Sequence, residues 1–276
     1  MVSTASTRPR RPQRAGTVAE FALSTILLFI AVTVTRWLRD PGSPVFIADL
    51  NLALLVNGAI SGTVLTGLIL SPLGRRSGGH MNPAVTVALW LMDAFPRRGV
   101  LPYVLAQLAG SVAGAALASV AWGDAASLPL VGHGAIRPSP AWPADHVFFA
   151  ELASMGAIIL VVGFLAHRNR ARLVPYAIGL SVGLVIAVLG PLSGGSINPA
   201  RQLGPAVLGG QTIDLWIYLI APIIGAALGA WLDRLLVRWS HPRRPTLSAG
   251  SPRLAPFPHE APAAAGHQTP SVSHHH

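Results

Sequence analysis

Two short stretches of this sequence carry the same tripeptide, each soon after a pair of glycines. The copies consist of Asn82, Pro83 and Ala84 and of Asn198, Pro199 and Ala200. Asparagine is a preferred residue just before a helix, and proline is tolerated at the first helical position, so each copy predicts a helix start. One copy alone would be an ordinary helix cap. Two copies can also present a pair of side-chain amides as hydrogen-bond donors to a solute.

Only the second copy continues with an arginine, Arg201, where the first has Val85. A guanidinium group can donate hydrogen bonds to a solute while its charge repels cations. In apolar surroundings it needs carbonyl or water partners. A salt bridge to Asp214 is the alternative, which is disfavoured because Asp214 stands at the start of the next apolar run, near the expected membrane interface.

Membrane helices must position these residues. Of the 276 residues 51% are hydrophobic and 11% are charged, whereas a soluble domain carries about a quarter charged residues. Six apolar runs are near or above the ~20 residues that cross ~30 Å of hydrocarbon, at 18–35, 45–70, 99–122, 145–166, 173–190 and 213–239. Two shorter segments, 83–94 and 199–208, begin at the tripeptides and reach about halfway across. The predicted fold is an all-α membrane protein with six transmembrane helices and two half-helices.

Several kinds of chemistry are excluded. The chain has no cysteine, which rules out disulfides and thiol chemistry. It has no phosphate-binding glycine loop and no serine nucleophile elbow, and His80 has no second histidine nearby to form a metal site. The net charge of +10 comes from arginines at the ends of apolar runs and in the tails. We therefore expect no enzyme, cofactor, metal or nucleic-acid partner.

The arginines also predict the orientation. Most lie before the first span, around the first half-helix, between the fourth and fifth spans, and after the last span. The opposite loops hold only Arg36, Arg39 and Arg137, apart from Arg201 in the second motif. Because cytoplasmic loops carry the excess of basic residues, we expect a multi-pass protein of the cell (inner or plasma) membrane with both termini in the cytoplasm.

The chain contains an inverted repeat. Glu20 opens a run that leads, one span later, to Asn82, and Glu151 opens a run that leads, one span later, to Asn198. Each repeat has three spans, so the second enters from the opposite face, and such repeats place their site near the midplane between the halves. Each glutamate could relay protons or could anchor the loop of its own half. Their matching positions favour anchoring.

The two half-helices are expected to meet tip to tip in mid-membrane. Their positive dipole ends, each about +0.5 charge, would then point at one place. If each asparagine oxygen caps its own helix, its NH2 group remains free for a solute. Irregular backbone at this depth is tolerated where it lines a wet cavity. The carbonyl-bearing residues predicted to line a narrow polar pore are Gly78, Gly79, His80, Met81, Gly194, Ser196 and Ile197.

The paired tripeptides, the SGGHMNPAVT and NPAR contexts and the glutamates of the first and fourth spans resemble the aquaporin, or major intrinsic protein, family. The resemblance covers roughly residues 18–239. It implies a six-helix bundle, a homotetramer, and one passive pore per subunit for small neutral solutes in the lipid bilayer. The expected boundaries are 1–16 for a disordered basic cytoplasmic tail, 17–240 for an aquaporin-like channel domain with repeats at 17–123 and 145–240, and 241–276 for a disordered cytoplasmic tail.

The family pattern, counted back from the motifs without gaps, places the selectivity filter at Gly62, Ile186 and Gly195, beside Arg201. Water-selective members carry a large aromatic residue at the first position and a histidine at the second. This sequence has neither, and it resembles the nodulin-type members, which pass glycerol, urea and undissociated boric, arsenous or silicic acid. A one-residue slip would replace Gly62 by Ser61 or Thr63, and helix packing is an alternative role for Gly62.

Two rival functions stay open on the sequence. One is a strictly water-selective channel. The other is a proton-coupled secondary transporter, because inverted repeats and broken helices serve both channels and transporters. The small number of spans, and the absence of a carboxylate at the half-helix tips, favour the channel.

Overall fold

Helices make up every regular element of residues 11–240, the part of the chain that the computed structural model describes. In chain order they are α1 (Arg11–Arg39), α2 (Leu50–Leu70), α3 (Pro72–Ser77), α4 (Pro83–Leu91), α5 (Arg97–Trp122), α6 (Asp124–Ser127), the 3-10 turn η1 (Gly132–Gly134), α7 (Ala144–His167), the 3-10 turn η2 (Ala171–Leu173), α8 (Val174–Leu189), α9 (Pro199–Leu208) and α10 (Leu215–Ser240).

Six of the described helices are long and apolar enough to cross a membrane, as predicted: α1, α2, α5, α7, α8 (with η2) and α10. Three boundaries differ by more than two residues, one of which is the end of α1, at Arg39 instead of 35. α1 begins at Arg11, so residues 11–16, expected in the N-terminal tail, are helical. α2 begins at Leu50 rather than near 45, because the Asp49 side chain accepts a hydrogen bond from Leu52 N at 2.7 Å and caps the helix there. The rest of the two predicted tails lies outside the described residues.

The two half-helices are α4, of 9 residues, and α9, of 10 residues. At 1.5 Å per residue each is about 14 Å long, roughly half of the ~30 Å hydrocarbon thickness. α9 ends where the sequence predicts, but α4 ends at Leu91, three residues before the predicted end. The chain turns there, since Asp93 has a positive φ of 60°.

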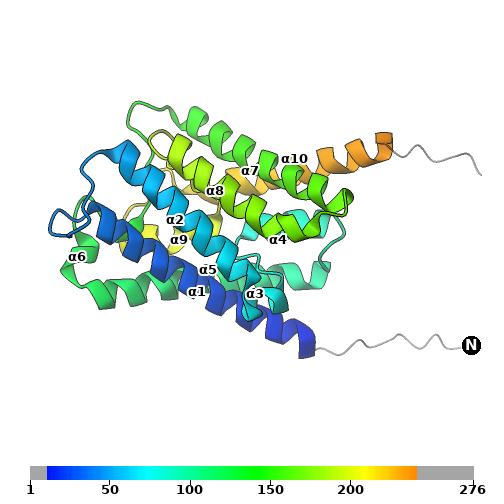
Figure 1. Ribbon diagram of the computed structural model, residues 1–276, viewed down its shortest axis with the longest axis horizontal. Coiled ribbons are helices and arrows are strands. Elements are labelled where there is room, and N and C mark those ends of the chain that lie inside the picture. Colours follow the sequence, from blue (N-terminus) through cyan, green and yellow to red (C-terminus); the bar gives the residue numbers. More distant parts are fainter. Residues whose placement is uncertain (1–10, 241–276) are drawn as a thin grey trace, which may run out of the picture. The chain divides into compact units, whose positions relative to one another are not determined.

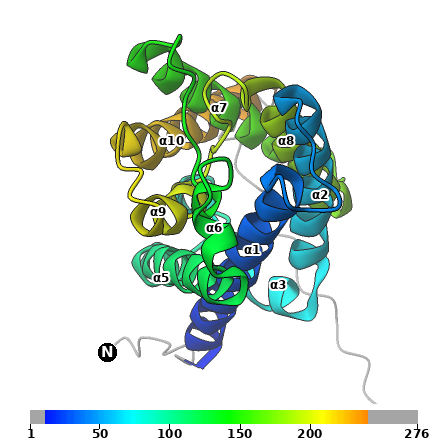
Figure 2. The same cartoon turned by 90° about the vertical axis from the view of Figure 1, so that its left-hand side faces the viewer.

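The helices pack in pairs that repeat between the halves. α1 packs along α5, and α7 packs along α10 in the same way, while α2 and α8 pack on each other (Figure 2). Each half-helix packs mainly on a helix of the other repeat: α4 lies on α10, and α9 lies on α5. α1 begins and α10 ends at the same end of the bundle, as an even number of spans requires (Figure 1).

Glycines allow these helices to approach closely. A Cβ atom on Gly114 of α5 would lie 2.3 Å from the carbonyl oxygen of Thr25 in α1, and one on Gly225 of α10 would lie 2.1 Å from that of Leu152 in α7. Real Cβ atoms do not come so near to a backbone oxygen, so a larger residue would push the helices apart. The small-residue patterns at Gly110 and Gly114 and at Gly225 and Gly229 therefore serve helix packing.

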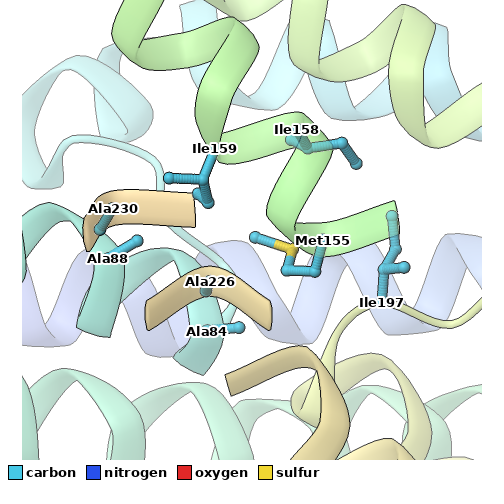
Figure 3. Packing of buried hydrophobic residues seen from close by; sticks show 8 residues of the cluster. All are labelled: Ala84, Ala88, Met155, Ile158, Ile159, Ile197, Ala226 and Ala230. Carbon is cyan, nitrogen blue, oxygen red and sulfur yellow. The ribbon is translucent and has the colours of Figure 1, made fainter. Parts of the chain in front are cut away.

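Small side chains also hold α4 against the other repeat. Ala84 and Ala88 of α4 are buried against Ala226 and Ala230 of α10, in a cluster completed by residues of α7 and by Ile197 (Figure 3). Met155 is one of the α7 members and also lines the internal cavity described below. The packing that positions the first half-helix thus forms part of the pore wall.

Candidate functional site

Each asparagine of the tripeptides caps its own half-helix. Asn82 Oδ1 accepts a hydrogen bond from Ala84 N at 2.8 Å, and Asn198 Oδ1 accepts one from Ala200 N at 2.9 Å. Both asparagines have extended backbone angles, and a proline follows each at the first helical position. The two helix starts therefore have the local geometry that the tripeptide predicts.

The asparagine amides also bind the two repeats to each other. Asn82 Nδ2 donates to the carbonyl oxygen of Ile197 at 3.0 Å, and Asn198 Nδ2 donates to that of Met81 at 2.9 Å. This corrects the expectation of a wholly free NH2 group, because one of the two hydrogens on each amide is used across the interface. Both asparagines also line the internal cavity, so one N–H of each amide remains for a solute.

The loops before the tripeptides have matching backbone conformations. The residues with positive φ are Gly78 (97°), Gly79 (61°) and Met81 (47°) in the first loop, and Gly194 (91°), Gly195 (63°) and Ile197 (45°) in the second. Glycine adopts such angles without steric cost, which explains the Gly-Gly pair in each loop. A residue with a Cβ atom pays about 1–3 kcal/mol there and persists only where its surroundings enforce it.

Glu20 holds the first loop in this conformation by hydrogen bonds from inside the helix bundle. Its Oε1 accepts hydrogen bonds from Ser77 Oγ at 2.6 Å and His80 N at 2.9 Å. Its Oε2 accepts from Met81 N and from Gln107 Nε2, both at 2.7 Å. The side chain is fully buried and does not line the cavity.

Glu151 holds the second loop in the same way. Its Oε1 accepts from Ser193 Oγ at 2.9 Å and from Ser196 N at 3.1 Å, and its Oε2 accepts from Ile197 N at 2.5 Å. Tyr218 donates to the carbonyl oxygen of Ser193, as Tyr103 does to that of Ser77 in the first repeat. Glu151 is also buried away from the cavity.

His80 lies where the first loop meets the cavity wall. Its Nδ1 lies 3.0 Å from Thr86 Oγ1, and its ring packs edge-on against Phe95 with centroids 4.8 Å apart. Among the described residues no group of three histidine, aspartate or glutamate side chains could hold a metal ion.

Two hollow spaces adjoin at the second tripeptide. An internal cavity of about 190 Å³ runs between the half-helix tips and the faces of α2, α7 and α8. An outer vestibule of about 330 Å³ lies beside η1 and the loop that follows it. Five residues line both spaces and so mark their junction: Leu54, Asn57, Ile136, Gly194 and Arg201.

Arg201 lies at this junction. Its Nη1 donates to the carbonyl oxygen of Gly134 in η1 at 2.9 Å. Asp214 is not among its partners: the ion pairs of the described residues do not include Arg201. The half-buried arginine is therefore held by a backbone carbonyl, as expected for a guanidinium group in apolar surroundings. Val85, its counterpart in the first repeat, also lines the cavity but is not at the junction with the vestibule.

The structure corrects one predicted filter residue. Ile186 and Gly195 line the cavity, but Gly62 does not. Gly62 is buried in the contact between α2 and α8, where a Cβ atom would lie 2.4 Å from the carbonyl oxygen of Gly179. Ser61 faces the cavity instead. Gly62 precedes Asn82 by 20 residues, whereas its partner Gly179 precedes Asn198 by 19. The first repeat therefore has one extra residue in this interval, and a count without gaps misses it.

The junction also includes a residue that the sequence did not single out. Ile136 comes from the loop after η1, and both backbone polar groups of this residue bond to Gln202. Gln202 Nε2 donates to Ile136 O at 2.9 Å, and Ile136 N donates to Gln202 Oε1 at 3.3 Å. Gln202 directly follows Arg201 and is buried. Its position next to the arginine was the available signal, but nothing in the sequence pairs it with residue 136.

The molecule is thus an inverted repeat whose two half-helices meet beside a cavity that adjoins a vestibule. This arrangement is that of a membrane channel. The sequence profile of the family described as major intrinsic protein matches residues 10–233, and the chain belongs to this family. It is a multi-pass membrane protein and a passive channel for water and small uncharged solutes, and it is not an enzyme.

Relatives of several origins resemble the chain. It is 39% identical to the "probable aquaporin AqpM" of Archaeoglobus fulgidus, over 62% of this chain and 72% of that protein. It is 36% identical to nodulin-26 of Glycine max, over 69% of this chain and 68% of that protein. The crystal structure of the aquaglyceroporin from Plasmodium falciparum superposes with a TM-score of 0.70 at 20% identity, covering 82% of this chain and 98% of the other, which shows a shared fold.

Proposed function

We propose that the channel passes uncharged polar solutes larger than water, such as glycerol, urea and undissociated boric, arsenous or silicic acid. The observation that carries this proposal is the composition of the ring beside Arg201. With Ser61 in place of Gly62, the other positions of this ring that the family resemblance implies are Ser61, Ile186 and Gly195; all three line the cavity, and none is aromatic. Small side chains leave room at the narrowest level and expose backbone carbonyls that can replace part of a solute's hydration.

The remaining residues have roles in guiding the solute and excluding ions. A solute would meet Arg201 first, then the carbonyl-bearing loop, and midway one N–H from each of Asn82 and Asn198. The N-terminal dipoles of α4 and α9 and the guanidinium group make the middle and outer pore positive, which opposes protons and cations. Pro83, Ala84, Pro199 and Ala200 position the asparagines, and Glu20 and Glu151 anchor the loops.

Two alternatives are less well supported. A strictly water-selective pore needs a tighter ring than Ser61, Ile186 and Gly195 provide. A proton-coupled transporter needs a carboxylate that solute or solvent can reach, whereas Glu20 and Glu151 are buried, hydrogen-bonded and away from the cavity.

We also propose that four copies assemble into a homotetramer in the cell (inner or plasma) membrane, with both termini cytoplasmic. Apolar side chains exposed on the outer faces of the helices, including Leu101, Val120, Phe149, Leu180 and Trp231, give a surface for lipid and for neighbouring subunits. The orientation rests on the arginine distribution.

A permeability panel in proteoliposomes tests the solute class. Stopped-flow light scattering with water, glycerol, urea and boric acid gradients should show solute fluxes well above protein-free vesicles. An imposed proton gradient should leave glycerol distribution unchanged. Water flux without solute flux would support the water-selective alternative, and gradient-driven glycerol accumulation would support a coupled transporter.

A further inference from the structure

Asn57 of α2 stands at the junction of the internal cavity and the outer vestibule, together with Arg201. It is half-buried, and it is an amide in a helix whose neighbouring residues are mostly apolar or small. Neither the paired motifs nor the ring beside Arg201 includes it. A polar side chain placed at the mouth of a narrow pore can act on every solute that passes.

A single hydrogen bond sets the orientation of the Asn57 amide. Ser61 Oγ, one turn further along α2, donates to Asn57 Oδ1 at 2.9 Å. This bond uses one of the two lone pairs of the amide oxygen and commits the serine hydrogen. No described residue accepts a hydrogen bond from Asn57 Nδ2, so the amide offers N–H donors, and Ser61 Oγ offers lone pairs. The two residues together present a donor and an acceptor on one side of the pore.

The matching positions of the other repeat have no such pair. Gly62 and Gly179 face each other where α2 crosses α8, which aligns Ser61 with Ile178 and Asn57 with Val174. All four of these last residues line the cavity. The polar pair therefore exists only in the first repeat, whose residue Asn57 lies at the junction with Arg201 of the second repeat. The matching wall of the second repeat, formed by Val174 and Ile178, is apolar.

We propose that Asn57 determines specificity: its Nδ2 donates to a hydroxyl oxygen of an uncharged polyol while Ser61 Oγ accepts a hydroxyl hydrogen, beside the donors of Arg201. This rests on the proposed function as a solute channel. A polyol at the narrow ring loses more of its hydration than a water molecule in single file, which keeps its water neighbours. Loss of the pair should therefore slow glycerol more than water.

Substitutions at Asn57, assayed by glycerol and water flux in proteoliposomes of the full chain, test this proposal. Asn57→Leu keeps the side-chain size and removes the amide, and Asn57→Ala removes both. Each should lower the glycerol-to-water permeability ratio about two- to tenfold, the effect of losing about one hydrogen bond. Ser61→Ala should lower it in the same direction. Asn51→Ala, on the exposed first turn of the same helix, is the matched control and should leave the ratio unchanged.

The outcomes distinguish hydrogen bonding of the solute by Asn57 from an effect of its side-chain volume alone. If Asn57→Ala raises the ratio, or if Asn57→Leu keeps the wild-type ratio, Asn57 acts as a spacer and the proposal is wrong. The wild-type channel is the reference for the broader proposal: a wild type that passes water and no glycerol contradicts the solute-channel function itself. A glycerol flux that is high in the wild type and equally high in both Asn57 variants contradicts the role of Asn57 alone.

Discussion

Asn82 donates its side-chain amide to the backbone carbonyl of Ile197, 115 residues away, at 3.0 Å. The reciprocal bond from Asn198 to Met81 has nearly the same length. The two asparagines, which both line the internal cavity, thus also join the two repeats by hydrogen bonds. A substitution of Asn82 or Asn198 therefore changes both the lining of the cavity and the contact between the two half-helix tips.

Replacing either asparagine by aspartate is expected to impair the channel. In Asn82→Asp the carboxylate cannot donate to Ile197 O, and its charge offsets the positive helix ends at the midplane. We expect glycerol and water flux to fall about tenfold, or a cation conductance to appear, in planar-bilayer and stopped-flow recordings. Asn51→Asp, on the exposed start of α2, controls for the added charge. Wild-type flux and intact ion exclusion in both Asn82→Asp and Asn198→Asp would show that these residues are not the midplane donors.

Replacing Arg201 by valine is expected to open a leak. Valine is the residue at the matching position of the first repeat. A unit charge acts on an ion about 4 Å away with about 4 kcal/mol at an effective dielectric constant of 20, and a third of this energy is about a tenfold change in rate. Proton or cation leak, read with a pH-sensitive dye in vesicles, should rise by at least about tenfold. The vestibule variant Arg137→Val should stay tight, and equal leaks from the two variants would contradict a special role for Arg201.

Gln202 is expected to position Ile136 at the junction. Gln202→Met keeps the length of the side chain and removes both hydrogen bonds to the Ile136 backbone, a cost of about 1–3 kcal/mol. Hydrogen–deuterium exchange should accelerate about tenfold or more across residues 132–138, and the glycerol-to-water ratio should change. Gln211→Met is the control, because Gln211 bonds only Gly209 O at 3.3 Å. Unchanged exchange in residues 132–138 would mean that other contacts hold this loop.

The sequence predicted the elements well because each has a local signal. Six apolar runs predict the spans, and Asn-Pro predicts the two helix starts. The positions of Glu20 and Glu151 also follow from the repeat. The sequence could not predict which side chains of two packed helices point into the cavity and which lie in the contact between the helices. The first repeat has one extra residue between Gly62 and Asn82. Gly62 therefore lies in the contact between α2 and α8, and Ser61 lines the cavity.

Loop contacts were also beyond the sequence. The pairing of Gln202 with Ile136 joins segments 66 residues apart, and no periodicity encodes such a contact. The bond from each asparagine to the opposite repeat is of the same kind. Capping could be predicted from the tripeptide, but the partner of the remaining amide hydrogen depends on how the two tips meet.

The central claim is that the ring beside Arg201 admits solutes larger than water because Ser61, Ile186 and Gly195 leave it wide. The most direct measurement is the glycerol-to-water permeability ratio of the wild type and of the double variant Ser61→Phe with Ile186→His, each reconstituted at matched protein density. We predict a high ratio in the wild type and a fall of at least about tenfold in the double variant, with water flux retained, because the large rings narrow the level where solutes must shed water. Glycerol flux that survives both substitutions in a channel that still conducts water would contradict the account.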